Sequence, residues 1–152
     1  MNGLLLELAP YLRRGHCCSQ LLADLALAKT GKKAPELVHA MKGLCLGIGG
    51  AGCDCGLLSG GAAILAWLSC PSGQEAHPML DALTNDYANW FLARTAASGS
   101  RCDGILDALS ASSEARPAPQ AADMALCTDL LSECWQKILD LCEEYDIEAI
   151  ED

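Results

Sequence analysis

The order of apolar and polar residues along the chain predicts helices and gives no sign of a strand. Between Cys17 and Lys29, apolar residues recur at the spacing i, i+3, i+4 and i+7, which places them on one face of a helix. The clearest pattern lies near the C-terminus, where one face is apolar and the other is mainly acidic. The apolar face comprises Cys127, Leu131, Cys134, Ile138, Leu141 and Tyr145. We therefore expect an all-α fold, a single-domain helical bundle of about five to six helices over residues 1–152.

The other segments complete this picture. Residues 4–12 form a short apolar helix disturbed by Pro10, and a stripe of Leu37, Met41, Leu44 and Ile48 predicts one helix after Pro35. Residues 56–70 are apolar nearly all round, as expected of a central helix surrounded by others. A long amphipathic helix starts near residue 80 and is expected to end at Gly99. Residues 110–120 are predicted to be a surface linker.

Charge narrows the choice of partner. The net charge is −10, which argues against nucleic acid and against an anionic membrane surface. Much of it lies in an acidic tail from about residue 143, which is interpreted as a solvated terminus. Within the longest stretch poor in charge, the uninterrupted helical part, residues 56–70, is too short and too rich in glycine for a membrane span. We expect an unidentified redox partner protein with a basic surface, and the many apolar helix faces are compatible with a homodimer.

Ten cysteines are far more than packing requires in 152 residues. In a secreted protein they would indicate a disulfide framework, and in the cytosol they indicate metal or redox chemistry. The first ten residues lack the basic segment and the long apolar run of a signal peptide, so we expect a cytoplasmic protein. Free thiols in this number would suit an anaerobe.

Four of these cysteines lie where their sulfurs could point to a common place in the fold. Cys18 lies near a helix start, Cys55 follows a glycine-rich loop, Cys102 lies in a turn, and Cys127 lies near the start of the last helix. Because Cys55 directly precedes a helix N-terminus, a thiolate is favoured there. Four thiolates are what an iron–sulfur cluster or a structural zinc ion requires. Their spacing matches no local signature, since the chain contains no C-x-x-C.

These residues resemble the redox-active protein family named for its C-GCAxxG-C-C cysteine pattern. The segment from Gly15 to Gln20 matches the context of the first cysteine, with Cys18 as the equivalent. Cys55, Gly56 and Gly60 match the second motif, where Leu57 replaces its alanine. Cys102 and Cys127 correspond to the third and fourth cysteines. The similarity covers roughly residues 5–145, and the added bulk of Leu57 is expected to alter access to the site.

The resemblance implies a redox role without naming a reaction. We expect electron transfer through an iron–sulfur cluster, with [2Fe–2S] as the first expectation, held by Cys18, Cys55, Cys102 and Cys127. Similar domains accompany a cluster in split-Soret-type cytochromes, which favours iron–sulfur over zinc. No residue is assigned a catalytic role.

Two alternatives stay open. The first is a thiol–disulfide oxidoreductase in which Cys55 is the nucleophile and Cys18 or Cys53 resolves the mixed disulfide. The second is a zinc-stabilised helical module that binds a partner.

The remaining candidates receive simpler interpretations. Cys17 and Cys53 could each be a resolving thiol or a substitute ligand, whereas His16 is expected to be a turn residue with solvent access. Asp54 is expected to cap the helix that begins at Cys55. Four further cysteines are expected to be free thiols that pack on apolar helix faces. They are Cys45, Cys70, Cys134 and Cys142.

Overall fold

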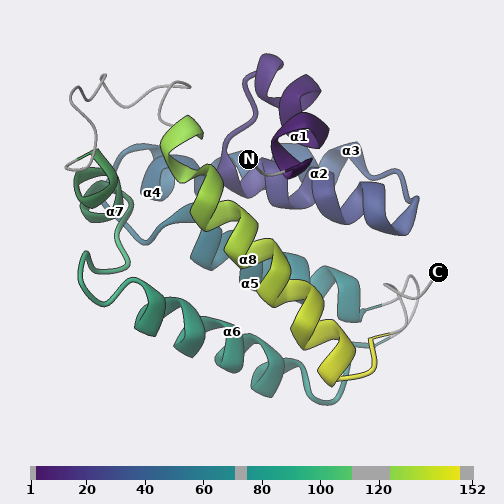
Figure 1. Ribbon diagram of the computed structural model, residues 1–152. Helices are drawn as coiled ribbons and strands as arrows, with labels where there is room; N and C mark the ends of the chain where they lie inside the picture. Colours follow the sequence, from purple (N-terminus) through teal and green to yellow (C-terminus); the bar gives the residue numbers. More distant parts are fainter. Residues whose placement is uncertain (1–2, 71–74, 111–123, 148–152) are drawn as a thin grey trace.

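The computed structural model describes residues 3–70, 75–110 and 124–147, and every regular element in these ranges is helical (Figure 1). The elements are α1 (Gly3–Arg13), α2 (Cys18–Thr30), α3 (Pro35–Met41), the 3-10 turn η1 (Lys42–Leu44), α4 (Cys45–Gly49), α5 (Gly56–Ser69), α6 (Leu80–Arg94), α7 (Cys102–Ser110) and α8 (Met124–Glu144). In the described ranges the β pairing is limited to one isolated antiparallel bridge, between Asp54 and Arg101. The predicted all-α bundle is therefore confirmed.

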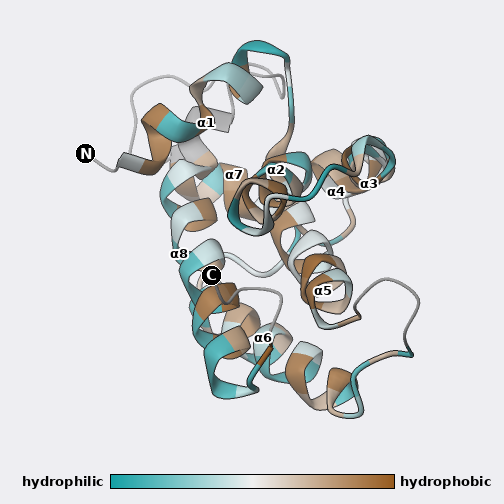
Figure 2. Ribbon diagram, turned by 90° about the vertical axis from the view of Figure 1, so that its right-hand side faces the viewer, coloured by the Kyte–Doolittle hydropathy of each residue, from teal (hydrophilic) through white to brown (hydrophobic). Residues whose placement is uncertain are grey.

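Helix α5 occupies the centre of the bundle and packs against α2, α6 and α8. The hydropathy colouring in Figure 2 shows apolar residues around much of α5, while α8 carries polar residues along its outer side. Ile64, Leu65 and Leu68 are almost completely buried. The sequence prediction of a central, surrounded helix is confirmed.

Small residues let the neighbours of α5 approach its backbone. A Cβ atom at Gly60 would lie 2.9 Å from the Cβ of Ser19 on α2. On the opposite side, a Cβ at Gly61 would overlap the ring and hydroxyl of Tyr87 on α6. Tyr87 is fully buried, and its hydroxyl donates a hydrogen bond of 2.6 Å to the carbonyl oxygen of Leu57. The two glycines thus fix how closely α2 and α6 pack on α5.

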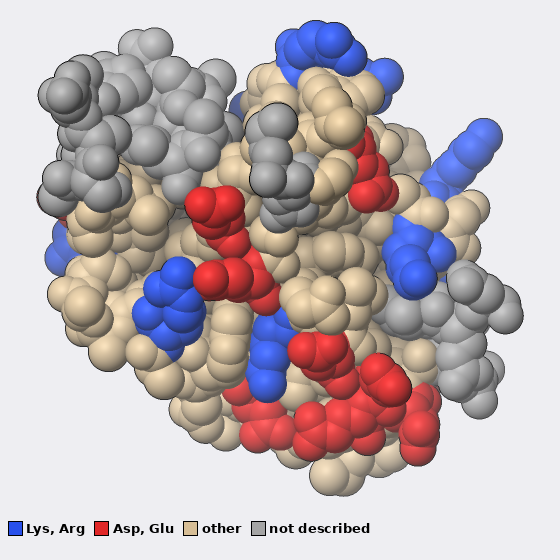
Figure 3. All heavy atoms as spheres, in the orientation of Figure 1, with Lys and Arg blue, Asp and Glu red and all other residues tan. Residues whose placement is uncertain are grey.

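The predicted faces of α8 are confirmed. Leu131, Ile138 and Leu141 are buried, whereas Glu133 and Asp140 are exposed. Figure 3 shows Asp and Glu side chains gathered towards the lower right of this face, where the end of α8 meets α6. Part of the predicted acidic tail, together with most of the predicted linker, lies outside the described residues.

The prediction of one helix from Leu37 to Ile48 is wrong. The segment breaks into α3, η1 and α4, and Leu46 and Ile48 have φ angles of 57° and 62°. Ile48 is 54% exposed and so does not join the apolar stripe. The backbone turns here because Gly47 tolerates a positive φ and its carbonyl oxygen accepts a hydrogen bond from the N–H of Cys53 at 3.1 Å. This break is one reason why more helical segments form than the five to six predicted.

Two further boundaries differ from the prediction. Helix α6 ends at Arg94 rather than at Gly99, and the hydroxyl of Thr95 bonds back to the carbonyl oxygen of Phe91 at 2.8 Å. Cys102 does not lie in a turn but begins α7, with Asp103 in its first turn. An acidic residue there interacts favourably with the positive end of the helix dipole.

Candidate functional site: a buried group of cysteines

The first cysteine of the candidate site is held by the start of α2. Cys17 precedes this helix, and its N–H donates to the side-chain oxygen of Gln20 at 3.2 Å. The amide nitrogen of Gln20 donates in turn to the carbonyl oxygen of Val38 on α3 at 3.1 Å. Gln20 therefore joins the N-terminus of α2 to α3. This contact fixes the position of Cys18, the first residue of α2. In the Cys-Ser-Gln motif, the glutamine has this structural task.

The second cysteine directly precedes α5, as the sequence predicted. The Sγ atom of Cys55 accepts a hydrogen bond from the N–H of Leu57 at 3.4 Å. The expectation that Asp54 caps this helix is wrong, because the Cys55 side chain takes that place. Asp54 instead accepts a hydrogen bond from the hydroxyl of Ser100 at 2.8 Å.

The third cysteine is brought to the second by paired backbones. The N–H of Cys55 donates to the carbonyl oxygen of Ser100 at 2.8 Å, and the N–H of Cys102 donates to the carbonyl oxygen of Cys53 at 3.2 Å. Cys102 therefore lies opposite Cys53 across the isolated bridge. Helix α7, which Cys102 begins, also packs against α4 and α8.

The sulfurs of Cys18 and Cys55 form a hydrogen-bonded pair. This bond and the burial of the site hold the pKa of Cys18 well above its ordinary value. The pKa of Cys55 is lowered, first because Cys18 donates to its sulfur and then because the N–H groups of Leu57 and Leu58 point at it, although burial opposes the shift. The pair thus favours a thiol at Cys18 and a thiolate at Cys55.

The other two predicted cysteines lie close enough to act on this pair. Negative charge on Cys127 and on Cys102 further raises the pKa of Cys18, after the larger effects of Cys55 and of burial. Cys18, Cys55 and Cys127 are buried, while Cys102 is half-buried. Cysteines from α7 and α8 are therefore near enough to influence the Cys18–Cys55 pair electrostatically. The role of the four cysteines as ligands stays a prediction, and among the described residues no three His, Cys, Asp or Glu side chains are arranged as a metal-binding group.

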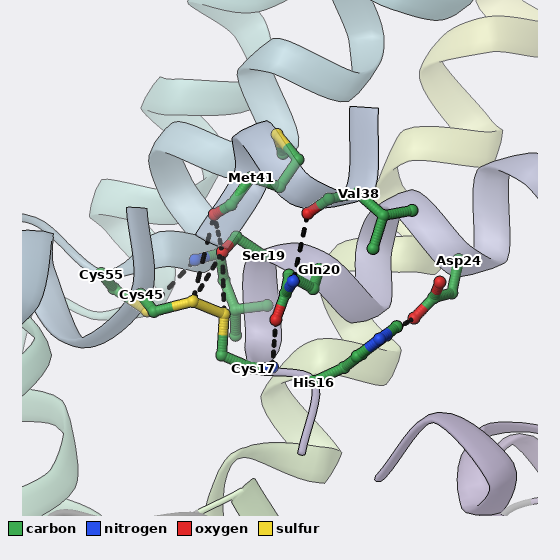
Figure 4. The surroundings of a disulfide bond; sticks show 10 residues. His16, Cys17, Ser19, Gln20, Asp24, Val38, Met41, Cys45 and Cys55 are labelled. Carbon is green, nitrogen blue, oxygen red and sulfur yellow. Dashed lines mark hydrogen bonds and ion pairs between the residues drawn. A yellow bond between two sulfur atoms is a disulfide. The ribbon is translucent and has the colours of Figure 1, made fainter. Parts of the chain in front are cut away.

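A disulfide joins Cys17 to Cys45 beside this group (Figure 4). Their Cα atoms are 5.9 Å apart, within the range that a disulfide requires. The expectation that Cys45 is a free packing thiol is wrong, and Cys17, whose role stayed open, is its partner. No sequence signal pointed to this pair, because the break between α3 and α4 that turns Cys45 towards α2 was not predicted.

His16 has a different role from the one expected. Its Nδ1 atom lies 2.6 Å from Oδ2 of Asp24, one of the few buried carboxylates, and Figure 4 shows the two side chains pointing at each other. Burial raises the pKa of Asp24, and His16 and Arg14 partly offset this rise. His16 is thus bound to Asp24 rather than being a solvated turn residue.

The remaining cysteines divide by exposure. Cys134 and Cys142 are buried thiols on α8, as predicted, and burial raises their pKa values to about 12 and about 11. Cys70 is only half-buried, so its assignment to the core was wrong in part. Cys53 is exposed and lies two residues from Cys55.

The fold and the site together define an all-α protein with a sheltered group of thiols at the helix starts. The profile of a family described as "putative redox-active protein (C-GCAxxG-C-C)" matches residues 16–141. The chain belongs to this family, and the resemblance drawn from its motifs is confirmed. No curated protein and no solved structure matches the chain. In the described ranges, no helix combines the length and the apolar character of a membrane span.

Proposed function

We propose that the chain is an electron-transfer protein in which Cys18, Cys55, Cys102 and Cys127 bind an iron–sulfur cluster. The observation that carries the proposal is that Cys55, Cys127 and Cys102, near the starts of α5, α8 and α7, all act electrostatically on Cys18 at the start of α2. A dithiol needs two sulfurs, whereas a cluster needs four. Zinc supplies four-thiolate sites but no redox chemistry, so membership of a redox-active family favours iron.

The surrounding residues are suited to such a group. The donor set consists of thiols, the ligand type that iron–sulfur clusters take. The N–H of Leu57 donates to the sulfur of Cys55 at 3.4 Å, and amide hydrogen bonds of this kind stabilise negative charge on sulfur. Leu57 is fully buried and excludes water from this side. The cluster would supply a centre that gains and loses one electron at a time.

The cysteines of the site differ in their exposure to solvent. Cys18 and Cys55 are fixed by the packing of α2 on α5, which Gly60 keeps close. Cys102 is half-buried, whereas Cys18 and Cys55 are buried. We propose that electrons pass at the Cys102 side, to a partner protein whose basic surface complements the net charge of −10.

The test begins with the protein purified without oxygen. We expect visible absorption bands that dithionite bleaches, with iron and acid-labile sulfide in equal amounts. Replacing any one of the four cysteines by serine should abolish or strongly reduce the bound iron. Cys142→Ser serves as the matched control, because Cys142 is a buried cysteine of the same bundle outside the group. A protein that takes up no iron and sulfide during anaerobic reconstitution would refute the proposal.

A second candidate function is thiol–disulfide exchange by Cys18 and Cys55. The specific observation in its favour is their hydrogen bond, with a thiolate favoured at Cys55. In this case iron-free protein should lose two hydrogens on mild oxidation, and peptide mapping should join Cys18 to Cys55. If the exposed Cys53 is the resolving thiol instead, peptide mapping should join Cys53 to Cys55, and Cys53→Ser should abolish that disulfide.

A further inference from the structure

We infer that Cys17 and Cys45 form a second redox site, a dithiol–disulfide pair that a dithiol reduces and a second disulfide compound re-oxidises by exchange while the protein stays folded. The pair lies outside the four proposed cluster ligands, so the inference does not depend on the proposed function. It rests on what surrounds the two sulfurs: hydrogen-bond acceptors that a disulfide cannot use and a dithiol can.

The hydroxyl group of Ser19 lies between the Met41 carbonyl and the two sulfurs, and its oxygen is the acceptor that faces the sulfurs. It donates its proton to the carbonyl oxygen of Met41 at 2.7 Å. Its oxygen lies 3.2 Å from Sγ of Cys17 and 3.6 Å from Sγ of Cys45. Because the proton is engaged with Met41, the lone pairs of the hydroxyl oxygen are left to face the sulfurs. Figure 4 shows Ser19 and the Met41 carbonyl grouped on one side of the disulfide.

The oxygen of Ser19 gains a donor from the two cysteines only when the disulfide is reduced. A disulfide sulfur carries no proton, so it donates nothing to Ser19. After reduction, a thiol of Cys17 or Cys45 can donate to the Ser19 oxygen. The carbonyl oxygen of Met41, 4.0 Å from Sγ of Cys45, accepts more weakly. These bonds stabilise the dithiol relative to the disulfide, and a disulfide whose reduced form is stabilised is the stronger oxidant.

The pair is buried, but less deeply than the neighbouring cysteines Cys18 and Cys55. Cys17 and Cys45 are each 9% exposed, more than Cys18 or Cys55. We therefore expect a dithiol reductant to attack one sulfur, forming a mixed disulfide and releasing the other sulfur as a thiolate. The second thiol of the reductant then attacks the mixed disulfide and leaves as a disulfide itself. Both protein sulfurs end as thiols, two electrons have moved, and the two protons come from the dithiol.

The test is an equilibrium titration of the whole protein in mixtures of reduced and oxidised glutathione. Free thiols are alkylated, the disulfide is then reduced and labelled with a second reagent, and mass spectrometry reports the state of the peptides carrying Cys17 and Cys45. Circular dichroism on the same samples reports the fold. We expect a two-electron transition within the buffer range while the helical signal stays native. A pair that stays oxidised throughout, or that is reduced only where helicity is lost, would overturn the inference.

Ser19→Ala tests the reason for the behaviour. Loss of the acceptor should make the pair harder to reduce, so the midpoint should move by about two- to tenfold in the glutathione ratio, the effect of one net hydrogen bond. Ser69→Ala is the matched control, because Ser69 is a buried serine on α5 whose hydroxyl bonds to the carbonyl oxygen of Ala66. An unmoved midpoint in a folded Ser19→Ala protein would show that the hydroxyl does not favour the dithiol.

Discussion

The contact between Gly61 and Tyr87 provides the sharpest test of how the bundle is packed around the site. At an exposed position in a helix, Gly→Ala raises stability by about 1 kcal/mol. At Gly61 the added methyl group would overlap the ring and hydroxyl of Tyr87. Tyr87 is fully buried and bonded to the carbonyl oxygen of Leu57 at 2.6 Å, so it cannot move aside without losing that bond.

The expected cost follows from these contacts. Loss of the hydrogen bond costs about 1 kcal/mol, and overpacking costs about 2 kcal/mol. After subtracting the helix-propensity gain of about 1 kcal/mol, Gly61→Ala should lower the free energy of unfolding by about 2 kcal/mol. For a chain of this size the unfolding midpoint should fall by about 4–8 °C. Urea denaturation followed by circular dichroism at about 222 nm measures the free energy directly.

A double-mutant cycle isolates the contact. In a Tyr87→Leu background the obstacle is smaller, so Gly61→Ala should show only its propensity gain, and the coupling energy should be about 3 kcal/mol. Gly43→Ala is the control, because a Cβ there meets nothing within 4 Å. If Gly61→Ala costs the same with and without Tyr87, the packing argument is wrong.

Three further predictions concern the cysteines and the contact between His16 and Asp24. Cys17→Ala combined with Cys45→Ala should lower the free energy of unfolding by about 3–4 kcal/mol, as expected for a cross-link over 28 residues, and in urea denaturation reductant should lower the stability of the wild type towards that of the variant. Burial raises the pKa of Cys134 to about 12, so its contribution to stability is complete below pH 9 and declines as the pH rises towards 12. Cys134→Ala should therefore reduce the loss of stability between pH 9 and pH 11. An unchanged slope of stability against pH would argue against a buried neutral thiol. His16→Ala should lower the free energy of unfolding by about 1.5–3 kcal/mol, because it removes the hydrogen-bond partner of the buried Asp24 carboxyl group. A decrease below about 0.5 kcal/mol in urea denaturation would mean that water replaces the imidazole.

The apolar periodicity was sufficient for the long helices but not for the short ones. In α8, Leu131, Ile138 and Leu141 repeat at helical spacing, and all three are buried. The stripe from Leu37 to Ile48 has the same spacing, yet the chain turns at Gly47. Periodicity reports which side of a helix would be buried, and it does not report whether glycine-rich backbone forms a competing turn.

The candidate site, too, could be predicted from the sequence only in part. The sequence by itself determined the all-α class, the four cysteines of the family pattern and the position of Cys55 before a helix, because each depends on local pattern or on a motif. Only the tertiary structure decided three contacts. They are the hydrogen bond between Cys18 and Cys55, the disulfide between Cys17 and Cys45, and the hydrogen bond between His16 and Asp24. These partners are brought together by the packing of α2 on α5 and by the turn after α3. Contacts between residues far apart in the chain depend on how whole helices pack, and the local pattern of one chain carries no direct record of that packing.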